Sequence, residues 1–377
     1  MPEPAAATLA VHAGATVFSD AKSTLVQTGP RPLVPGGSGA EQLRRTARAL
    51  EEEPEGVLVA GAVPFDLSAP GALRVGPAVR TRGPLTPDAA RVVRPATVAR
   101  SRPHPSPARY AAAVREALAR IESGDVQKVV LARSLELTAL VDWSVPDLVA
   151  ELAARNPAAT TLAVPVDDPA QAGGRWLVGA SPELLLRRRG PSVLLRPLAG
   201  SVPRSPEPEE DLRRADALMA SDKDRREHAY VVEAVVETLR PLCRTVSAPE
   251  PELLATPTVW HLATRVTALL NDTTTTSVDL VAALHPTPAV GGSPRRAAAQ
   301  VIREVEEVDR GCYAGAVGWQ DGDGDGEWVV GVRCAEVAGR LLRILGGAGI
   351  VAGSDPDAEV RETAAKMRTV LEAAVRR

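Results

Sequence analysis

Hydrophobic positions between residues 106 and 377 recur with two different spacings. Apolar residues at helical spacing predict five helices, at about 107–123, 145–155, 209–240, 295–308 and 356–376. Alternating or continuous apolar runs bounded by Gly and Pro predict strands at 128–137, 160–166, 175–181, 183–189, 192–200, 313–320, 327–337 and 340–351. Because helices and hairpins are mixed without regular βαβ alternation, we predict an α+β fold in which large antiparallel sheets are flanked by helices.

The N-terminal residues, 1–105, follow a different pattern. They are rich in Ala, Pro, Gly and Arg, and they contain short strand-like runs such as 56–65 but no chemical motif. We therefore predict that 1–105 form a motif-poor scaffold at the beginning of a single large domain, and that 106–377 form its catalytic region.

The turn at 321–326, DGDGDG, imitates the start of a calcium-binding EF-hand loop. Counted from Asp321, the position that should carry a bidentate glutamate is occupied by Val332, and the flanking segments are predicted strands rather than helices. We therefore predict a hairpin turn and reject a calcium site here.

Composition and charge narrow the classes of function. The formal net charge is −3, and no Lys/Arg cluster with interleaved aromatic residues is present, which argues against a nucleic-acid partner or a membrane surface. The three cysteines, Cys243, Cys312 and Cys334, lack the spacing of a zinc site or a disulfide framework. No apolar run is long enough to span a membrane, and there is no sign of an export signal. We expect a cytoplasmic monomer that acts on a small molecule.

Lysine is rare in this chain. Only Lys22, Lys128, Lys223 and Lys366 occur among 44 basic residues, so arginine has taken most positions that need only a positive charge. The remaining lysines are candidates for roles that require an ammonium or a neutral amine, which a guanidinium cannot supply. Chance retention is the alternative.

Two pairs of carboxylates have helical spacing. Asp224 and Glu227, and likewise Glu359 and Glu362, lie three positions apart, so each pair presents both carboxylates on one helix face. If the two faces meet, the carboxylates surround one point that suits a hard divalent cation such as Mg²⁺. Two solvated helix faces are the alternative, and the spacing does not decide between them.

A possible anion-binding segment follows near the C-terminus. The glycine-rich run Gly346–Gly349 closes a predicted strand, with Arg333 before it and Lys366 after it, a combination that could clamp a carboxylate. A glycine-rich turn is the alternative. His261 and His285 lie in apolar surroundings that are more typical of hydrogen-bonded core histidines than of catalysts.

Eight motifs in collinear order resemble the chorismate-utilising enzymes, the family of isochorismate, anthranilate, aminodeoxychorismate and salicylate synthases. The resemblance covers about 105–377, and the motifs are KVVLAR (128–133), GASPELLL (179–186), PLAGS (197–201), SDKDRREH (221–228), VWHLAT (259–264), LHPTPAVGG (284–292), GEWVVGVRCA (326–335), and GAGIV followed by Glu359 to Lys366. The likeness is greatest to isochorismate synthases. Anthranilate synthases carry Gln where Lys128 stands, and aminodeoxychorismate synthases typically carry Lys at the position of Ala199.

The resemblance implies a role for each matching residue. It implies that Lys128 is the base that activates water and that Glu183 is the acid. Both roles require burial, which favours a neutral amine and a protonated carboxyl. It implies that Glu227 and Glu362 bind Mg²⁺ directly, with Asp224 and Glu359 in support. The implied substrate-binding residues are Ala199, Gly200, His261, Thr264, Ala289, Arg333, Gly347, Ala348, Gly349 and Lys366.

The expected activity is conversion of chorismate to isochorismate for a catechol siderophore or for menaquinone, with an isochorismatase as a possible functional partner. Three alternatives remain open. A salicylate synthase would go on to release pyruvate, an anthranilate-type enzyme would need ammonia, and an inactive paralogue would bind chorismate without turnover. The role of Lys223 is also open, because it may only pair with a helix carboxylate.

Overall fold

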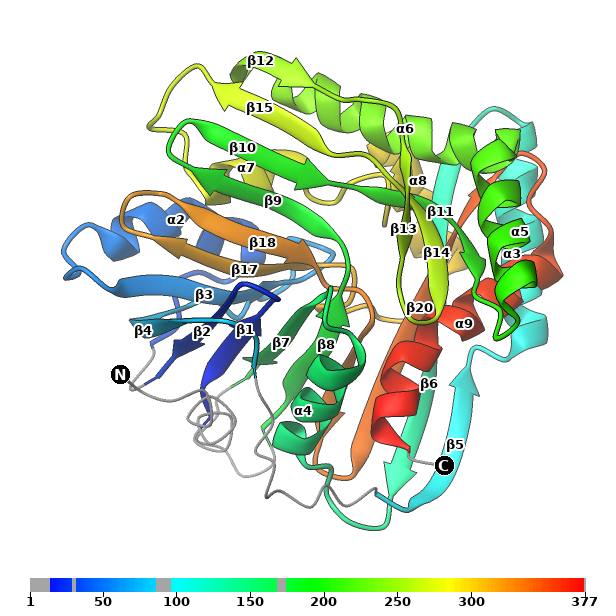
Figure 1. Cartoon of the computed structure of the whole chain (residues 1–377), viewed down its shortest axis with the longest axis horizontal. Coiled ribbons are helices and arrows are strands. Elements are labelled where there is room, and N and C mark those ends of the chain that lie inside the picture. Colours follow the sequence, from blue (N-terminus) through cyan, green and yellow to red (C-terminus); the bar gives the residue numbers. More distant parts are fainter. Residues whose placement is uncertain (1–13, 29–31, 86–95, 168–173, 376–377) are drawn as a thin grey trace.

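The structure is a computed structural model that describes residues 14–28, 32–85, 96–167 and 174–375 (Figure 1). All paired strands in it are antiparallel. In the first sheet, neighbouring strands follow the order β5 (Val98–His104), β6 (Lys128–Ala139), β20 (Leu341–Val351), β19 (Cys334–Ala338), β8 (Trp176–Ser181), β7 (Thr160–Pro165), β1 (Thr16–Ser19), β2 (Ser23–Gln27) and β4 (Arg74–Arg82). The short strand β16 (Gly292–Ser293) pairs with the start of β6.

A second sheet continues from β4. Its order is β4, β3 (Val57–Val63), β17 (Ala316–Asp321), β18 (Gly326–Val330), β9 (Leu184–Arg189), β10 (Ser192–Arg196), β15 (Val266–Leu270) and β12 (Cys243–Ser247). A separate small sheet has the order β11 (Leu198–Pro203), β14 (Val259–Ala263) and β13 (Glu252–Ala255). Strands from before residue 105 thus pair with strands of the later region in both large sheets.

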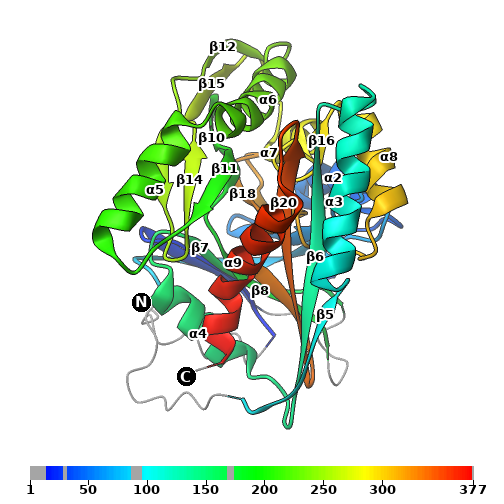
Figure 2. The ribbon, with the colours of Figure 1, turned by 90° about the vertical axis from the view of Figure 1, so that its right-hand side faces the viewer.

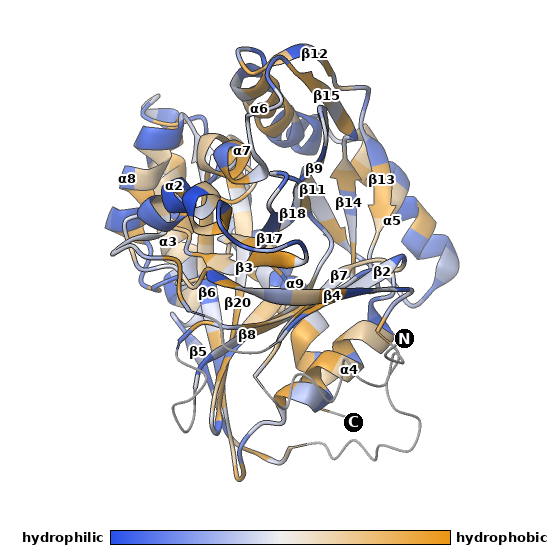
Figure 3. Cartoon of the chain, turned by 90° about the vertical axis from the view of Figure 1, so that its left-hand side faces the viewer, coloured by the Kyte–Doolittle hydropathy of each residue, from blue (hydrophilic) through white to orange (hydrophobic). Residues whose placement is uncertain are grey.

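Helices cover the sheets. They are α2 (Gly39–Leu50), α3 (Pro107–Glu122), α4 (Val145–Arg155), α5 (Pro208–Ala220), α6 (Asp222–Leu239), α7 (Ser277–Leu284), α8 (Arg295–Val305) and α9 (Pro356–Ala374). Figure 2 shows α9 crossing β20, with α3 beside β6. Hydrophilic stretches lie on the outside of α2, α5 and α8, whereas the enclosed strands are largely hydrophobic (Figure 3). The predicted α+β class with large antiparallel sheets is confirmed.

Three predicted elements are interrupted. The predicted long helix at 209–240 is two helices, because Ser221 is extended and its side chain accepts a hydrogen bond from Asp224 N at 3.2 Å, which caps α6. The predicted strand at 192–200 divides at Pro197, which has no N–H for a ladder, so β10 and β11 join different sheets. The predicted strand at 327–337 divides before Arg333, whose φ is +55°.

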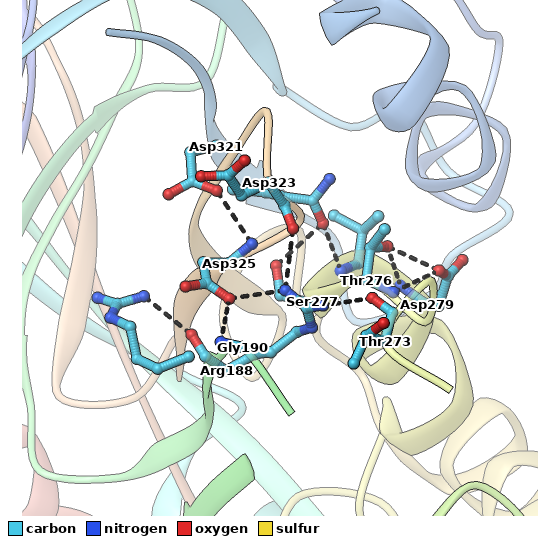
Figure 4. A network of polar contacts seen from close by, with 12 residues as sticks. Arg188, Gly190, Thr273, Thr276, Ser277, Asp279, Asp321, Asp323 and Asp325 are labelled. Carbon is cyan, nitrogen blue, oxygen red and sulfur yellow. Dashed lines mark hydrogen bonds and ion pairs between the residues drawn. The ribbon is translucent and has the colours of Figure 1, made fainter. Parts of the chain in front are cut away.

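The hairpin turn predicted at 321–326 is confirmed, and its carboxylates are used within the hairpin and by β9. Asp325 Oδ1 accepts hydrogen bonds from Arg188 Nη1 at 2.6 Å and from Gly190 N at 2.7 Å, and Asp325 N donates to Asp321 Oδ1 at 3.0 Å (Figure 4). The acidic turn therefore fastens β17 and β18 to β9. Within the described residues, no helix has the length and apolarity needed to cross a membrane.

Candidate active site

A small cavity is lined by residues of β20, β11, β14, α6 and α9. Figure 2 shows that these elements lie close together. The cavity's volume of about 50 Å³ is far below the roughly 300–1,000 Å³ of pockets that hold drug-sized ligands. Its lining contains ten of the predicted site residues, namely Glu183, Ala199, Gly200, Glu227, His261, Ala289, Arg333, Gly347, Gly349 and Lys366. The fold thus gathers residues from distant parts of the sequence at one place.

The alternation of side chains along β20 decides which of its residues reach the cavity. Gly347 and Gly349, which pair with Ala132 and Val130 of β6, are two positions apart and therefore lie on the same face of the strand. This face borders the cavity. Ala348 lies between them on the opposite face, fully buried, and does not line the cavity. A Cβ on Gly349 would lie only 2.0 Å from Glu227 Oε1, so glycine is required for this close approach.

Lys128 begins β6 and is fully buried. Its ammonium lies 3.1 Å from Glu227 Oε1, but it makes no hydrogen bond of normal geometry with the described residues. Its Cε lies 3.1 Å from the position that a Cβ on Gly349 would occupy. Lys128 therefore sits next to two residues that line the cavity, in the buried environment that a catalytic amine needs.

Glu183 occupies the short connection between β8 and β9, directly after Pro182. Its side chain is only 6% exposed, and Leu198 N donates a hydrogen bond to its Oε1 at 3.5 Å. Burial raises the pKa of Glu183 to about 7, although the Leu198 amide and the charge of Lys128 act in the opposite direction. A carboxyl with this pKa is partly protonated at neutral pH, as a general acid requires.

Arg333 and His261 form a buried polar pair at the cavity wall. Arg333 Nη2 lies 3.0 Å from His261 Nε2, and Arg333 Nε has no hydrogen-bond partner among the described residues. Burial lowers the pKa of His261 well below its usual value, and the charge of Arg333 lowers it further, so the imidazole is neutral. The left-handed backbone of Arg333 is unusual for a residue other than glycine, and such conformations concentrate at functional sites.

Three of the four lysines pair with three of the predicted carboxylates. The ion pairs are Lys128–Glu227 at 3.1 Å, Lys223–Glu359 at 3.0 Å and Lys366–Glu362 at 2.5 Å. Because the second pair joins α6 to α9, the two acidic helix faces do meet. The pairing also accounts for one contact of Lys223. Burial lowers the pKa of Lys223, but the carboxylates of Glu359, Glu227 and Asp224 together raise it above its usual value.

The carboxylates carry features that suit a cation. Burial, reinforced by Glu362, raises the pKa of Glu359 to about 7, and Glu359 Oε2 has no hydrogen-bond partner among the residues whose positions are described. Burial and the charges of Glu227 and Glu362 likewise raise the pKa of Asp224. In the described part of the chain, however, no three acidic, His or Cys side chains converge at metal-binding distance, because lysine ammoniums lie among them.

Two predicted substrate-binding residues, Ala348 and Thr264, do not line the cavity, and two further residues do. Thr264 turns away from the cavity, and its hydroxyl lies 2.8 Å from His228 Nε2. Tyr313 and Ser201 line the cavity but were not predicted. Ser201 donates a hydrogen bond to Glu362 Oε1 at 2.7 Å. Its hydroxyl is the only polar side chain of the motif PLAGS, which was a usable signal, whereas nothing in the sequence distinguishes Tyr313.

Comparison with known proteins identifies the family of the chain. A family model described as chorismate binding enzyme matches residues 85–375. Isochorismate synthase DhbC of Bacillus subtilis is 43% identical over 371 residues, which are 96% of this chain and 93% of the relative. The crystal structure of DhbC from Bacillus anthracis superposes with a TM-score of 0.88 at 37% identity and covers 95% of each chain.

The structure of MenF, the menaquinone-specific isochorismate synthase from Escherichia coli, is also similar. It superposes with a TM-score of 0.80 at 25% identity, covering 96% of this chain and 88% of that chain. The family model spans more than half of the chain, and the relative from Bacillus subtilis matches nearly all of it. The chain belongs to the family of chorismate binding enzymes.

Proposed function

We propose that this enzyme converts chorismate to isochorismate. The observation that carries the proposal is the combination, around one cavity, of a buried lysine, Lys128, with a buried carboxyl, Glu183, whose pKa of about 7 lets it donate a proton. Chorismate carries two carboxylates, and the buried guanidinium of Arg333 supplies a matching cation. The relatives named isochorismate synthases support the same reaction.

The reaction requires a base and an acid. Water adds at C2 of the ring and loses a proton to the neutral amine of Lys128. The ring double bonds shift, the C4–O bond breaks, and the C4 hydroxyl leaves as water with a proton from Glu183. Lys128 can accept a proton only when it is not held as the ammonium partner of Glu227, so the proposal requires another cation for Glu227.

We propose Mg²⁺ as that cation. Glu227 and Glu362 would hold it directly, with Asp224 and Glu359 acting through water. The raised pKa values of Asp224 and Glu359 and the unpartnered Glu359 Oε2 support a site that lacks positive charge. When bound, Mg²⁺ would balance the charge of a substrate carboxylate.

We also propose a biosynthetic pathway that uses the isochorismate. We place the enzyme in catechol siderophore biosynthesis, supported by its likeness to the DhbC structure, which superposes with a TM-score of 0.88 at 37% identity. The putative isochorismate synthase MenF of Mycobacterium tuberculosis is 44% identical over 87% of this chain, so sequence identity alone does not separate the two pathways. Menaquinone biosynthesis is the second candidate. An isochorismatase would then consume the product. We also expect a cytoplasmic monomer. Size-exclusion chromatography with light scattering measures the oligomeric state.

Incubation of the purified protein with chorismate, with and without Mg²⁺, tests the function. Chromatography should show isochorismate only with Mg²⁺ and no accumulation of pyruvate. Pyruvate formed together with salicylate would establish a salicylate synthase instead. Chorismate recovered unchanged under all conditions would contradict the proposal and favour a protein that binds without turnover.

A further inference from the structure

A second cavity adjoins the catalytic cavity at Pro182 and Arg333, which line both. Its volume is about 290 Å³. Its outer rim includes the exposed residues Pro157 and Pro257, whereas Ala180, Pro182 and Arg333 at its other end are buried. We call this cavity the vestibule, because it leads from solvent to the wall of the catalytic cavity.

The lining of the vestibule is positively charged. Three arginines line it, Arg196, Arg204 and Arg333, and no described lining residue is Asp or Glu. Arg204 is neutralised by Asp211, whose Oδ2 lies 2.6 Å from Arg204 Nη2. Within the described chain, neither Arg196 nor Arg333 forms an ion pair. The vestibule therefore offers two cations that are not held in ion pairs with the described residues.

Arg196 has unused hydrogen-bonding capacity. It lies at the end of β10, partly buried, and its Nη2 donates to the backbone oxygen of Pro182 at 3.2 Å. Its Nε is buried and has no partner among the residues that the structure describes. A buried guanidinium N–H without a partner is costly, so a ligand acceptor is the natural way to satisfy it. Arg333 Nε is likewise buried without a hydrogen-bond partner among the described residues.

We propose that the vestibule is the route by which the dicarboxylate substrate reaches the catalytic cavity, and that Arg196 binds one of its carboxylates there. The other walls suit the ring, because they are largely apolar and include Ala159, Leu254 and Pro257. The proposal rests on chorismate being the substrate. It assigns Arg196 to substrate binding and not to the chemical step.

A purely structural role for Arg196 would be to anchor Pro182 next to Glu183, and two substitutions separate the roles. Arg196→Gln keeps a hydrogen-bond donor but loses the charge, whereas Arg196→Lys keeps the charge. We expect Arg196→Gln to raise KM for chorismate about tenfold with kcat within about twofold of wild type, and Arg196→Lys to restore KM. Arg244→Gln, an exposed arginine of β12, is the matched control and should change neither constant.

Benzoate, a planar carboxylate without the enolpyruvyl group, provides a readout that does not depend on turnover. By calorimetry it should bind wild type and Arg196→Lys, and about tenfold more weakly to Arg196→Gln. A folded Arg196→Gln with wild-type KM and wild-type benzoate affinity would overturn the vestibule, as would a loss of kcat at unchanged KM. Absence of isochorismate from the wild type would instead overturn the proposed function.

Discussion

Two buried arginines near Tyr313 are bonded to very different degrees. Arg310 donates to both carboxylate oxygens of Glu306 at 2.7 Å and to the backbone oxygens of Val290 and Val130. The guanidinium of Arg333 has only His261 as a hydrogen-bond partner among the described residues, and its Nε is unpartnered. A buried charge with all its partners holds the fold together, whereas one with missing partners is available to a ligand.

The Arg310–Glu306 pair also supports the site indirectly. Glu306 Oε2 accepts a hydrogen bond from Ala132 N at 2.7 Å, and Arg310 Nη2 donates to Val130 O at 2.8 Å. Both contacts fix β6, the strand that begins with Lys128. The same comparison extends to Lys128, which is fully buried with a single carboxylate neighbour and no hydrogen bond of normal geometry to the described residues. We expect incompletely bonded charges to matter for activity and fully bonded ones for stability.

Replacement of Lys128 should have the largest effect on activity. Lys128→Gln removes the base, so turnover should fall by about 10²–10⁴-fold, while Tm should change little with Mg²⁺ present, because Glu227 then pairs with the proposed cation instead of Lys128. Steady-state kinetics and thermal unfolding measure the two effects. Lys22→Gln, an exposed lysine of the N-terminal hairpin, is the matched control. Wild-type-like turnover in Lys128→Gln would remove Lys128 as the base.

Replacement of Arg310 should have the largest effect on stability. Arg310→Met leaves the Glu306 carboxylate buried without its partner, and the free energy of unfolding should fall by about 3–5 kcal/mol. Urea unfolding measures this loss. The double variant Arg310→Met, Glu306→Met should recover part of it, because no charge remains unpaired. A loss below about 1 kcal/mol in the single variant would break the comparison.

Replacement of Arg333 should reduce activity strongly and stability only slightly. Arg333→Met removes a cation that is available to the substrate, and kcat/KM should fall about 100-fold because a charge-assisted hydrogen bond is lost. The free energy of unfolding should change by less than about 1 kcal/mol, since few protein partners are lost. A stability loss as large as that of Arg310→Met would show that Arg333 is structural.

The smallest of the expected effects is a shift in the pH dependence of kcat/KM. The carboxyl of Glu183 must be protonated, and its pKa is raised to about 7. The protonated form is present below this pKa and is lost as the pH rises, so kcat/KM should fall about tenfold per pH unit above pH 7 on the acid's limb of the profile. Since the charge of Arg333 lowers the Glu183 pKa, Arg333→Met should move this limb to higher pH. A limb at the same pH in both enzymes would contradict the assignment.

Part of this architecture could be predicted from the sequence. Hydrophobic spacing located β6, β20 and α9, because each has a continuous periodic pattern. The break at Ser221 is less visible, because no Gly or Pro marks it and the local hydrogen bond of its side chain decides. The break at Pro197 is also less visible, because apolar residues continue on both sides of it. The antiparallel pairing of β10 and β11 with different neighbours depends on contacts distant in sequence.

Many residues of the site could be predicted from the sequence, but their arrangement in space could not. The scarcity of lysine and the motifs pointed to Lys128, Glu227 and Glu362. The pairing of Lys223 with Glu359, however, follows only from how α6 packs against α9, and that of Lys128 with Glu227 from how α6 lies beside β6. The placement of Ala348 away from the cavity follows from strand alternation. Arg196 gave no signal, because one arginine is inconspicuous in an arginine-rich chain.

Central to the proposed reaction is the addition of solvent water at C2 as the C4 hydroxyl leaves. Reaction of chorismate with Mg²⁺ in water enriched in oxygen-18, followed by mass spectrometry of the isochorismate, tests it most directly. We expect one labelled oxygen in the isochorismate formed, located at the C2 hydroxyl. Isochorismate that forms without label would contradict it, because the C2 oxygen would then have come from the substrate itself.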